Sequence, residues 1–298
     1  MVDGKTILIT GCGSLATALS RHLLLHHKPK KIILYSRDEY LQNVTSGILS
    51  DPVGVLRFFI GDVRDRFRLD LAMRDVQVVV HTAALKRVDT VEYNPLEAIK
   101  TNIHGTENVM LACVQHNVQK AIFISTDKAV MPVNLYGATK MVGEQLWLHA
   151  NIYKEIFSAV RYGNVMGSRG SVLPAFQAIA KKKEVFPITD SRMTRFWVKM
   201  EEAVGLIMTA LGGDPKKVYV LNSPTFKIVD LAKALYARAK FNEIGNRGNE
   251  KLHEMLVREN DTDVVLSSGG REMDLLNALP FTSDENNMSI AEIREMLK

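Results

Sequence analysis

The sequence predicts an α/β protein with a doubly wound parallel sheet, and three observations support this prediction. Strand-like apolar runs alternate with helix-like runs throughout the first half of the chain. Successive strands are separated by enough chain for a helical crossover, which parallel pairing requires. Polar and glycine residues follow the strands directly, and sheets of this class bind ligands beyond the carboxyl ends of their strands.

The expected elements follow one another in a regular order. Strands are expected at residues 6–10, 31–35, 56–60, 76–81, 121–125 and 157–161, and helices from the first glycine turn to about residue 26 and at about 39–50. The residues that come just after these strands, or close one of them, are Gly11, Ser36, Asp62, Ala83 and Ser125. We therefore expect a ligand site to gather around these five positions.

After residue 161 the alternation loosens. Residues 163–170 are rich in Gly, Ser and Asn, a helix is expected at 172–182, and residues 187–195 are expected to be irregular. A helix at 201–211 and a strand at 218–221 fit a return to the main sheet, and a short helix is expected at 289–297. The prediction is a sheet domain of residues 1–163 with a return segment at about 200–222, interleaved with a smaller part of residues 164–199 and 223–298.

Composition excludes several classes of protein. The 298 residues are 46% hydrophobic and 24% charged, as in a globular domain, and the net charge of +5 is dispersed, so nucleic acid is not an expected partner. No apolar run approaches the roughly 18 residues of a membrane helix, and no signal-peptide pattern is present, so we expect a cytoplasmic protein without a membrane segment. Cys12, Cys113 and the histidines, His253 included, lack metal-ligand spacing, so no metal site is expected.

A glycine-rich turn predicts a dinucleotide site. Residues 11–16, GCGSLA, match the pattern GxGxxA between the first strand and the first helix, where backbone amides and the helix N-terminus bind a pyrophosphate. This is the signature of a Rossmann-type fold, which makes residues 1–163 the cofactor domain. The expected contacts in this region are Gly11, Gly13, Ser14, Leu15, Ser36, Arg37, Asp62 and Val63.

The second strand ends in residues that favour NADP. An enzyme that uses NAD shows an acid at this position for the ribose hydroxyls, whereas this chain has Ser36 and Arg37, which suit a 2'-phosphate. Asp38 follows closely and could face a ribose, so NAD stays as the alternative. Asp62 with Val63 is either an adenine contact or simply part of a turn.

The segment from Ser125 to Lys140, STDKAVMPVNLYGATK, carries the chemistry. If it is helical from residue 135, Tyr136 and Lys140 lie on one face, and the ammonium lowers the pKa of the phenol from its usual value of about 10. Tyr236 and Lys240 repeat the spacing without a Thr-Asp-Lys segment upstream, and we interpret that second pair as a solvated helix face.

These motifs together resemble a known family. The segments at 10–16, 61–62, 83–84 and 102–106, with Tyr136 and Lys140, are similar to extended short-chain dehydrogenase/reductases. TAALKRVDTVEYNPLEAIKTN, STDKAVMPVNLYGATK, VRYGNVMGSRGSVLPAF, ITDSRMTRFW and EKLHE resemble the soluble, inverting UDP-N-acetylglucosamine 4,6-dehydratases that begin pseudaminic acid synthesis. The chain departs from that pattern in a glycine loop one residue shorter, in RGNE at 247–250 where the family has RPGE, and after residue 254.

The resemblance implies a lyase that oxidises C4 of UDP-N-acetylglucosamine transiently, removes water across C5 and C6, and inverts C5. Tyr136 with Lys140 would take the C4 hydroxyl proton, Thr126 would hold the C4 oxygen, and Lys128 and Asp127 would be the base at C5 and the acid at C6. Those last two roles require the lysine pKa to fall from about 10.4 and the aspartate pKa to rise from about 3.9. In an arbitrary protein the Asp-Lys pair would be a solvated loop.

The resemblance also implies the binding residues. Ala83, Lys86 and Asn102, with Tyr136 and Lys140, complete the expected cofactor contacts. The expected UDP-sugar contacts are Lys86, Asn164, Arg169, Val172, Thr189, Met193, Arg195, Arg247 and Glu250. Met193 has core packing as its alternative, and a homo-oligomer is expected by analogy. Two other functions stay open: a related nucleotide-sugar epimerase or reductase, and a non-catalytic NADP-binding sensor.

Overall fold

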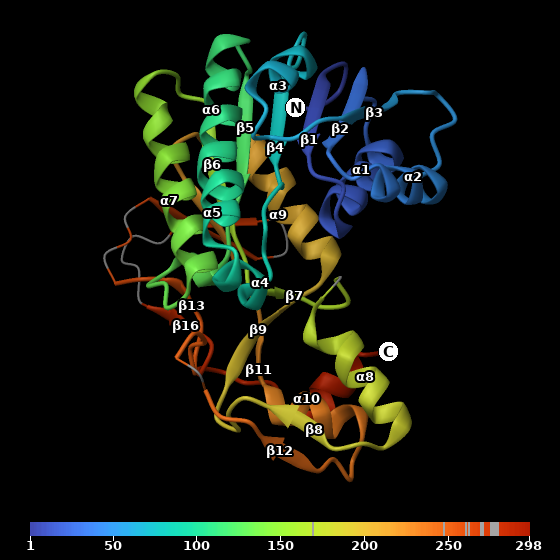
Figure 1. Ribbon diagram of the computed structural model, residues 1–298, viewed down its shortest axis with the longest axis vertical. Coiled ribbons are helices and arrows are strands. Elements are labelled where there is room, and N and C mark those ends of the chain that lie inside the picture. The colour runs from blue at the N-terminus through green and yellow to red at the C-terminus, as the bar shows by residue number, and fades with distance from the viewer. Residues whose placement is uncertain (169, 247, 260, 262, 269–270, 275–279) are drawn as a thin grey trace.

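The computed structural model describes the chain from residue 1 to residue 298 except for residues 169, 247, 260, 262, 269–270 and 275–279. A layered α/β part contains the N-terminus, and a smaller part extends below it and contains the C-terminus (Figure 1). The expected contacts Arg169 and Arg247 lie outside the described residues.

A nine-stranded sheet forms the larger part, counted over the described residues, in the order β15-β14-β10-β6-β5-β4-β1-β2-β3. All its neighbouring strands pair in parallel except β14 with β15. The predicted fold class is therefore confirmed. The bounds are β1 (Thr6–Thr10), β2 (Lys31–Ser36), β3 (Leu56–Ile60), β4 (Val78–His81), β5 (Lys120–Ile124), β6 (Phe157–Arg161), β10 (Val218–Leu221), β14 (Val264–Ser268) and β15 (Arg271–Asp274).

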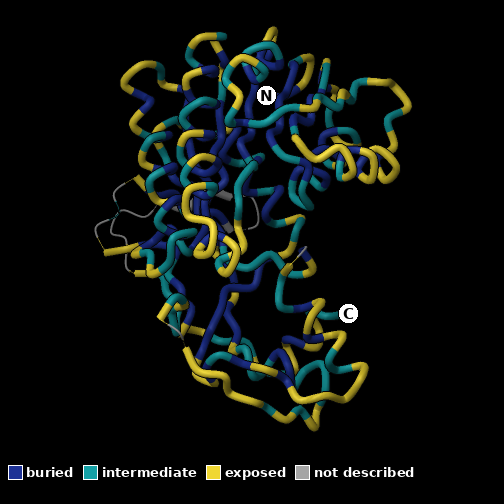
Figure 2. The backbone as a smooth tube through the Cα atoms, viewed as in Figure 1, coloured by how far each residue is buried: buried dark blue, intermediate teal, exposed yellow. Residues whose placement is uncertain are grey.

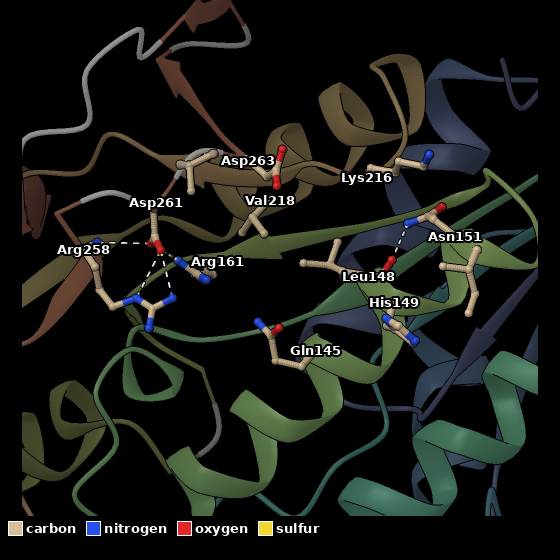
Figure 3. A pocket seen from close by; sticks show the side chains of 12 residues that line it. Gln145, Leu148, His149, Asn151, Arg161, Lys216, Val218, Arg258, Asp261 and Asp263 are labelled. Atoms are coloured by element: carbon tan, nitrogen blue, oxygen red, sulfur yellow. Dashed lines mark hydrogen bonds and ion pairs between the residues drawn. The ribbon is translucent and has the colours of Figure 1, made fainter.

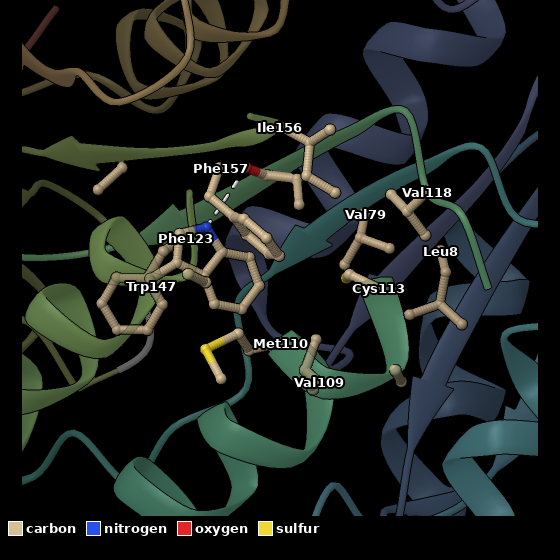
Figure 4. Close-up of a cluster of buried hydrophobic side chains, with 14 of the residues drawn as sticks. Leu8, Val79, Val109, Met110, Cys113, Val118, Phe123, Trp147, Ile156 and Phe157 are labelled. Atoms are coloured by element: carbon tan, nitrogen blue, oxygen red, sulfur yellow. Dashed lines mark hydrogen bonds between the residues drawn. The ribbon is translucent and has the colours of Figure 1, made fainter. Parts of the chain in front are cut away.

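Helices cover both faces of this sheet (Figure 1). Along β1 the side chains alternate: Leu8 packs into one apolar cluster with Phe123 and Trp147, while Ile7 and Ile9 pack into a second cluster on the other face. Figure 4 shows the first cluster. The elements between and around the strands are α1 (Ser14–His26), α2 (Glu39–Ile48), α3 (Arg66–Ala72), α4 (Val88–Tyr93), α5 (Pro95–Ala98), the π-helix η1 (Ile99–His104), α6 (Gly105–Gln115), the short η2 (Asp127–Ala129), α7 (Leu135–His149), η3 (Ala150–Ile152) and α9 (Met200–Gly212).

The smaller part has its own apolar core. Phe176, Phe186, Trp197, Phe226 and Ile293 are buried together there. In Figure 2, buried stretches of this part lie inside exposed segments that run along its outer edge. Its helices are α8 (Val172–Lys182), α10 (Ile228–Leu235) and α11 (Ile290–Met296). Outside the main sheet, the described strands pair in the orders β11-β9-β7, β12-β8 and β13-β16. Their bounds are β7 (Asn164–Val165), β8 (Phe186–Ile188), β9 (Thr194–Val198), β11 (Thr225–Lys227), β12 (Phe241–Glu243), β13 (Met255–Val257) and β16 (Phe281–Thr282).

Three sequence predictions are wrong in this region. Residues 187–195 were expected to be irregular, yet β8 and the start of β9 lie there because their apolar side chains enter the smaller core. Residues 223–298 were expected to form only the smaller part, but β14 and β15 extend the main sheet beside β10. The Tyr236–Lys240 pair is not on a helix, because α10 ends at Leu235 and Tyr236 is already extended.

Among the described residues, no helix combines the length and the apolar character needed to cross a membrane. Cys12 and Cys113 are both buried, and within the described part of the chain neither forms a disulfide.

Candidate active site

The glycine turn after β1 has the backbone shape that close approach to a ligand requires. Gly11 has φ +88°, and a Cβ there would lie 2.9 Å from the Thr82 hydroxyl oxygen, so only glycine fits. A Cβ on Gly13, which caps α1, would meet no protein atom within 4 Å. The first turn of α1 carries neither an acid nor a capping side chain, so its amides suit an anionic phosphate. These features fit a dinucleotide.

The end of β2 presents a guanidinium at the surface. Arg37 is 51% exposed and pairs with Asp62 at 3.3 Å between Nη1 and Oδ2. Asp62 is also held by Arg64 at 2.7 Å, and these contacts outweigh the effect of burial and lower the pKa of Asp62. Asp38 accepts a hydrogen bond from the Leu41 amide at 2.9 Å and caps α2. The carboxylate that was the alternative ribose contact therefore already has a structural partner.

The buried Asn102 of η1 ties two parts of the site together. Its amide nitrogen donates to the Leu85 carbonyl at 2.9 Å and to the Thr139 hydroxyl at 3.0 Å, and its amide oxygen accepts from the Leu85 backbone at 2.8 Å. Both amide hydrogens are thus used within the protein. Asn102 fixes the segment that follows β4 against α7, and this segment contains Ala83 and the exposed Lys86.

His81, at the end of β4, is a site residue that the sequence analysis missed. Its Nδ1 lies 2.7 Å from the Thr10 hydroxyl, and its Nε2 lies 3.0 Å from the Thr106 hydroxyl. Thr106 donates its own hydrogen to the Asn102 carbonyl, so Thr106 accepts from Nε2–H, and Thr10 donates to Nδ1. Burial lowers the pKa of His81 to about 3, which keeps the ring neutral. This series of hydrogen bonds, from Thr10 through His81 and Thr106 to the Asn102 carbonyl, links the residue before the glycine turn to η1.

Tyr136 and Lys140 lie one turn apart on α7, as expected, but the predicted effect of the lysine on the phenol is wrong. The Lys140 ammonium lies 3.8 Å from the centre of the Phe123 ring, and burial lowers its pKa to about 7. Burial raises the pKa of Tyr136 to about 12; the charge of Lys128 and a hydrogen bond with Thr126 only partly oppose this. The cation that acts on the phenol here is Lys128, because Lys140 faces the aromatic ring.

Asp127 and Lys128 begin η2 at the carboxyl end of β5. The Asp127 carboxylate is fully buried, accepts from the Thr126 hydroxyl at 2.8 Å through Oδ1, and lies 3.0 Å from the Lys128 ammonium. Its Oδ2 is buried without a hydrogen-bond partner. Burial raises the pKa of Asp127 and the charge of Glu254 adds to this, so the aspartate shift has the direction that an acid requires.

The expectation for Lys128 is wrong in this structure. Burial lowers the pKa of its ammonium, but Asp127 and Glu254 raise it more, so the net shift is upward. Lys128 lies between these two carboxylates, at 3.0 Å from Asp127 and 3.4 Å from Glu254. It is therefore an ammonium in this state, and the lowered pKa that a base at C5 requires is not found here.

Glu254 is the most consequential residue that the sequence analysis did not select. Although EKLHE at 250–254 was part of the resemblance, only Glu250 was taken from it. Glu254 is 2% exposed, precedes β13, and faces Lys128, Lys251 at 3.5 Å and Arg195 at 4.0 Å. Burial raises the pKa of its carboxyl, but the three cations outweigh burial and lower it. A buried lysine needs carboxylates nearby, and this requirement at Lys128 is the signal that could have pointed to Glu254.

The structure brings some expected UDP-sugar contacts together and leaves others apart. Arg195 of β9 is buried, bonds to the Met193 sulfur at 3.5 Å and pairs with Glu250 at 3.4 Å. Asn164 of β7 has a buried amide oxygen without a hydrogen-bond partner. Val172 begins α8 and packs against the smaller core, while Thr189 is half-buried just after β8.

A cavity of about 520 Å³ lies apart from these residues. It is bounded by the last turns of α7, by η3 and by the edges of β6, β10 and β14, where Arg161, Arg258 and Asp261 form ion pairs (Figure 3). None of the expected catalytic or binding residues lines it. Across the described residues, no cluster of three or more His, Cys, Asp or Glu side chains could hold a metal ion.

Comparisons with known proteins agree with this geometry. One relative, named UDP-N-acetylglucosamine 4,6-dehydratase (inverting), from Campylobacter jejuni subsp. jejuni serotype O:23/36 (strain 81-176), is 47% identical over 275 residues, covering 89% of this chain and 81% of the relative. Another, named UDP-glucose 4-epimerase, from Rickettsia bellii (strain OSU 85-389), is 43% identical over 270 residues, covering 86% of this chain and 79% of the relative.

Structure comparison and family comparison complete the assignment. The X-ray structure of Pen from Bacillus thuringiensis superposes with a TM-score of 0.91 at 32% identity, covering 99% of this chain and 98% of that one. The resemblance to inverting dehydratases found in the sequence is confirmed by these similarities. A model of the family described as polysaccharide biosynthesis protein matches residues 7–269, and the chain therefore belongs to the polysaccharide biosynthesis protein family.

Proposed function

We propose that this protein is a nucleotide-sugar 4,6-dehydratase that converts UDP-N-acetylglucosamine to a UDP-4-keto-6-deoxy sugar with inversion at C5. One observation carries the proposal. A fully buried carboxyl group, Asp127, lies 3.0 Å from the Lys128 ammonium at the carboxyl end of β5, in the electrostatic neighbourhood of Tyr136. Removal of water needs an acid and a base that simple oxidation of an alcohol does not.

The first step is the oxidation at C4. Tyr136 removes the proton of the C4 hydroxyl as a phenolate, the form that burial disfavours and that the charge of Lys128 and the Thr126 hydroxyl favour. The Thr126 hydroxyl also positions the C4 oxygen. When bound, a dinucleotide, NADP by preference, would supply the hydride chemistry of this reaction, as acceptor of the C4 hydrogen and donor of that hydrogen to C6. Gly11, Gly13 and the N-terminus of α1 would hold its pyrophosphate, because they combine a tight turn with uncapped amides.

The second step is the removal of water. The ketone at C4 acidifies the hydrogen on C5, which Lys128 removes while Asp127 donates its proton to the departing C6 hydroxyl. The raised pKa of Asp127 supports its role as the acid. Lys128 starts as an ammonium and Asp127 keeps its proton for the C6 hydroxyl, so Lys128 must pass its proton to the ionised Glu254 before it acts as the base. Tyr136 then returns a proton to C5 from the opposite face, which inverts that centre.

The UDP-sugar is held where the two parts of the chain meet. Arg195 lies on β9 beside Glu250 and the catalytic Lys128, and a buried guanidinium suits a diphosphate. The amide oxygen of Asn164 is buried and unpartnered, so it can accept a hydrogen bond from the substrate. These side chains support the binding of a nucleotide diphosphate sugar between β7, β9 and η2.

Arg37 supports NADP over NAD, and its exposure makes this testable. Its guanidinium is half exposed with one long contact to Asp62, so it can reach a 2'-phosphate, and Asp38 is engaged in capping α2. Replacing Arg37 by Ala should raise the Kd for NADP by about tenfold, in line with the loss of a charge-assisted hydrogen bond, while the Kd for NAD stays within about twofold. Equal changes for both cofactors, measured by titration calorimetry, would contradict the preference.

The activity itself is tested with the purified protein and UDP-N-acetylglucosamine alone. Mass spectrometry of the nucleotide sugar should show the loss of one water, without consumption of added cofactor. A product that keeps its mass while the protein is shown to contain dinucleotide would refute the dehydratase.

An epimerase is the second candidate, because a 43% identical relative carries the name UDP-glucose 4-epimerase. Epimerisation at C4 requires the Tyr136 step but no acid for the C6 hydroxyl, and it would leave the buried Asp127 without a task. An isomeric product that keeps the C6 hydroxyl would support this alternative. A non-catalytic sensor would bind dinucleotide and leave the sugar unchanged.

A further inference from the structure

Glu254 contributes a negative charge to the active site from a part of the chain remote from the Ser125–Lys140 segment. Its carboxylate is buried ahead of β13, and Oε1 lies 3.4 Å from the Lys128 ammonium. Its backbone amide donates to the Ser283 hydroxyl at 2.8 Å, which fixes the residue against the segment that follows β16. The side chain is therefore anchored on one side and faces Lys128 on the other.

Two carboxylates flank one ammonium in this cluster. Asp127 Oδ1 lies 3.0 Å from Lys128. Both Asp127 Oδ2 and Glu254 Oε2 are buried without a hydrogen-bond partner among the described residues, although Oε2 lies 3.5 Å from the Lys251 ammonium. Two buried negative charges that share one cation repel each other, so one of the two carboxyl groups takes up a proton. Arg195 at 4.0 Å and Lys251 at 3.5 Å stabilise the charge on Glu254, which leaves the proton with Asp127.

We propose that Glu254 is a positioning residue for the removal of water: its ionised carboxylate holds the Lys128 ammonium and keeps Asp127 in the protonated form that donates to the departing C6 hydroxyl. This inference rests on the proposed dehydratase activity. Glu254 needs no contact with the substrate for this task, because it acts through Lys128 and Asp127. The opposite shifts in pKa of the two carboxyl groups, up for Asp127 and down for Glu254, agree with this division.

The other charged groups around Glu254 support the same division. On the η2 side it faces Asp127 and Lys128, on the β9 side it faces Arg195, and from its own segment Lys251 approaches. Lys251 also donates to the Val130 carbonyl, which holds this cation near η2. Removing the charge of Glu254 would leave Asp127 as the sole carboxylate beside Lys128. Asp127 would then lose its proton and form an ion pair with Lys128, so it would have no proton to donate to the C6 hydroxyl.

The test separates the two chemical steps in the full-length protein with its dinucleotide. Glu254→Gln keeps the shape but removes the charge, and Glu254→Asp keeps the charge. Dehydration of UDP-N-acetylglucosamine is measured across pH, and oxidation at C4 is measured separately from the absorbance of the reduced cofactor, with a UDP-sugar that lacks the C6 hydroxyl. Glu250→Gln is the matched control, since Glu250 also pairs with Arg195, at 3.4 Å, but is not among the partners of Lys128.

The expected result is specific to the second step. Glu254→Gln should lower kcat for dehydration about 10- to 100-fold at neutral pH, because general acid catalysis contributes at least about that factor to the rate. The basic limb of the pH profile should move down by about one pH unit, because Asp127 loses its proton more easily without the charge of Glu254. Oxidation at C4 should stay within about twofold, and Glu254→Asp should restore much of the profile. Glu250→Gln should change KM without moving the limb.

Three outcomes would overturn the inference. One is an unchanged pH profile in Glu254→Gln; another is an equal loss of oxidation and dehydration in that variant, which would indicate a structural role alone. If Glu254→Gln does not fold, the third outcome is measured with Glu254→Asp. A pH profile of dehydration that has lost its basic limb in Glu254→Asp, although the charge is retained, would contradict the proposal. A wild-type protein that forms no dehydrated product would instead refute the proposed function before any variant is compared.

Discussion

At the scale of single residues, the chemistry depends on which carboxyl group holds a proton. Sequence spacing predicted Asp127, Lys128 and Tyr136 as one group, and the structure places them in contact or electrostatic reach of one another. Sequence spacing could not predict the charges of these side chains, because the charges depend on burial and on Glu254, which is remote in sequence. The assumed pairing of Lys140 with the phenol was wrong, since the Phe123 ring faces that ammonium.

Two matched substitutions separate the steps at this scale. Tyr136→Phe should lower kcat by about 10²- to 10⁴-fold and prevent cofactor reduction, because the C4 proton has no acceptor. Asp127→Asn should lower dehydration by a similar factor while oxidation at C4 continues, so reduced cofactor accumulates on mixing. Stopped-flow absorbance distinguishes the two, with dinucleotide content as the control. Equal behaviour of the two variants would contradict the division of roles.

The pH dependence follows from the raised pKa of Asp127. An acid catalyst is active only while protonated, so kcat should fall as pH rises through the folded-state pKa of Asp127, which lies above the usual value of about 4. The linked stability has the same sign: it is fully present below the unfolded pKa and is lost as pH rises through the folded one. A pH–rate profile without a basic limb would argue against Asp127 as the acid.

At the scale of elements, the turn between β1 and α1 shows what a motif predicts. The glycines of GCGSLA indicated a dinucleotide, and the structure gives each a different physical role. Gly11 has φ +88° and contacts the segment after β4, whereas Gly13 faces open space. The hydrogen-bond chain through His81 that connects this turn to η1 could not be predicted, because histidine at the end of a buried strand is usually interpreted as packing.

This difference gives a prediction for α1 and its turn. Gly11→Ala should destabilise the cofactor-free protein by about 1–2 kcal/mol or more, since alanine is strained at positive φ and its Cβ meets the Thr82 hydroxyl oxygen. Gly13→Ala should leave that stability within about 0.5 kcal/mol but weaken dinucleotide binding. Thermal unfolding with and without NADP measures both. Comparable destabilisation by the two substitutions would contradict the assignment.

At the scale of the whole molecule, the alternation of strands and helices predicted the parallel sheet and all of its first six strands. It did not predict β14 and β15, because strands of four and five residues after a long irregular stretch have no distinct pattern. The candidate active site includes a residue of this later part of the chain, since Glu254 and β13 lie just before β14 and face η2. Glu254 therefore places a negative charge beside Lys128 in the candidate site.

The most direct test of the account is the NMR spectrum of the product formed from UDP-N-acetylglucosamine in heavy water by the purified protein, without added cofactor. We expect a 4-keto-6-deoxy sugar that carries deuterium at C5 with inverted configuration, because the C5 proton exchanges with solvent and returns from the opposite face. A sugar that keeps its C6 hydroxyl, or a C5 position free of deuterium, would contradict it.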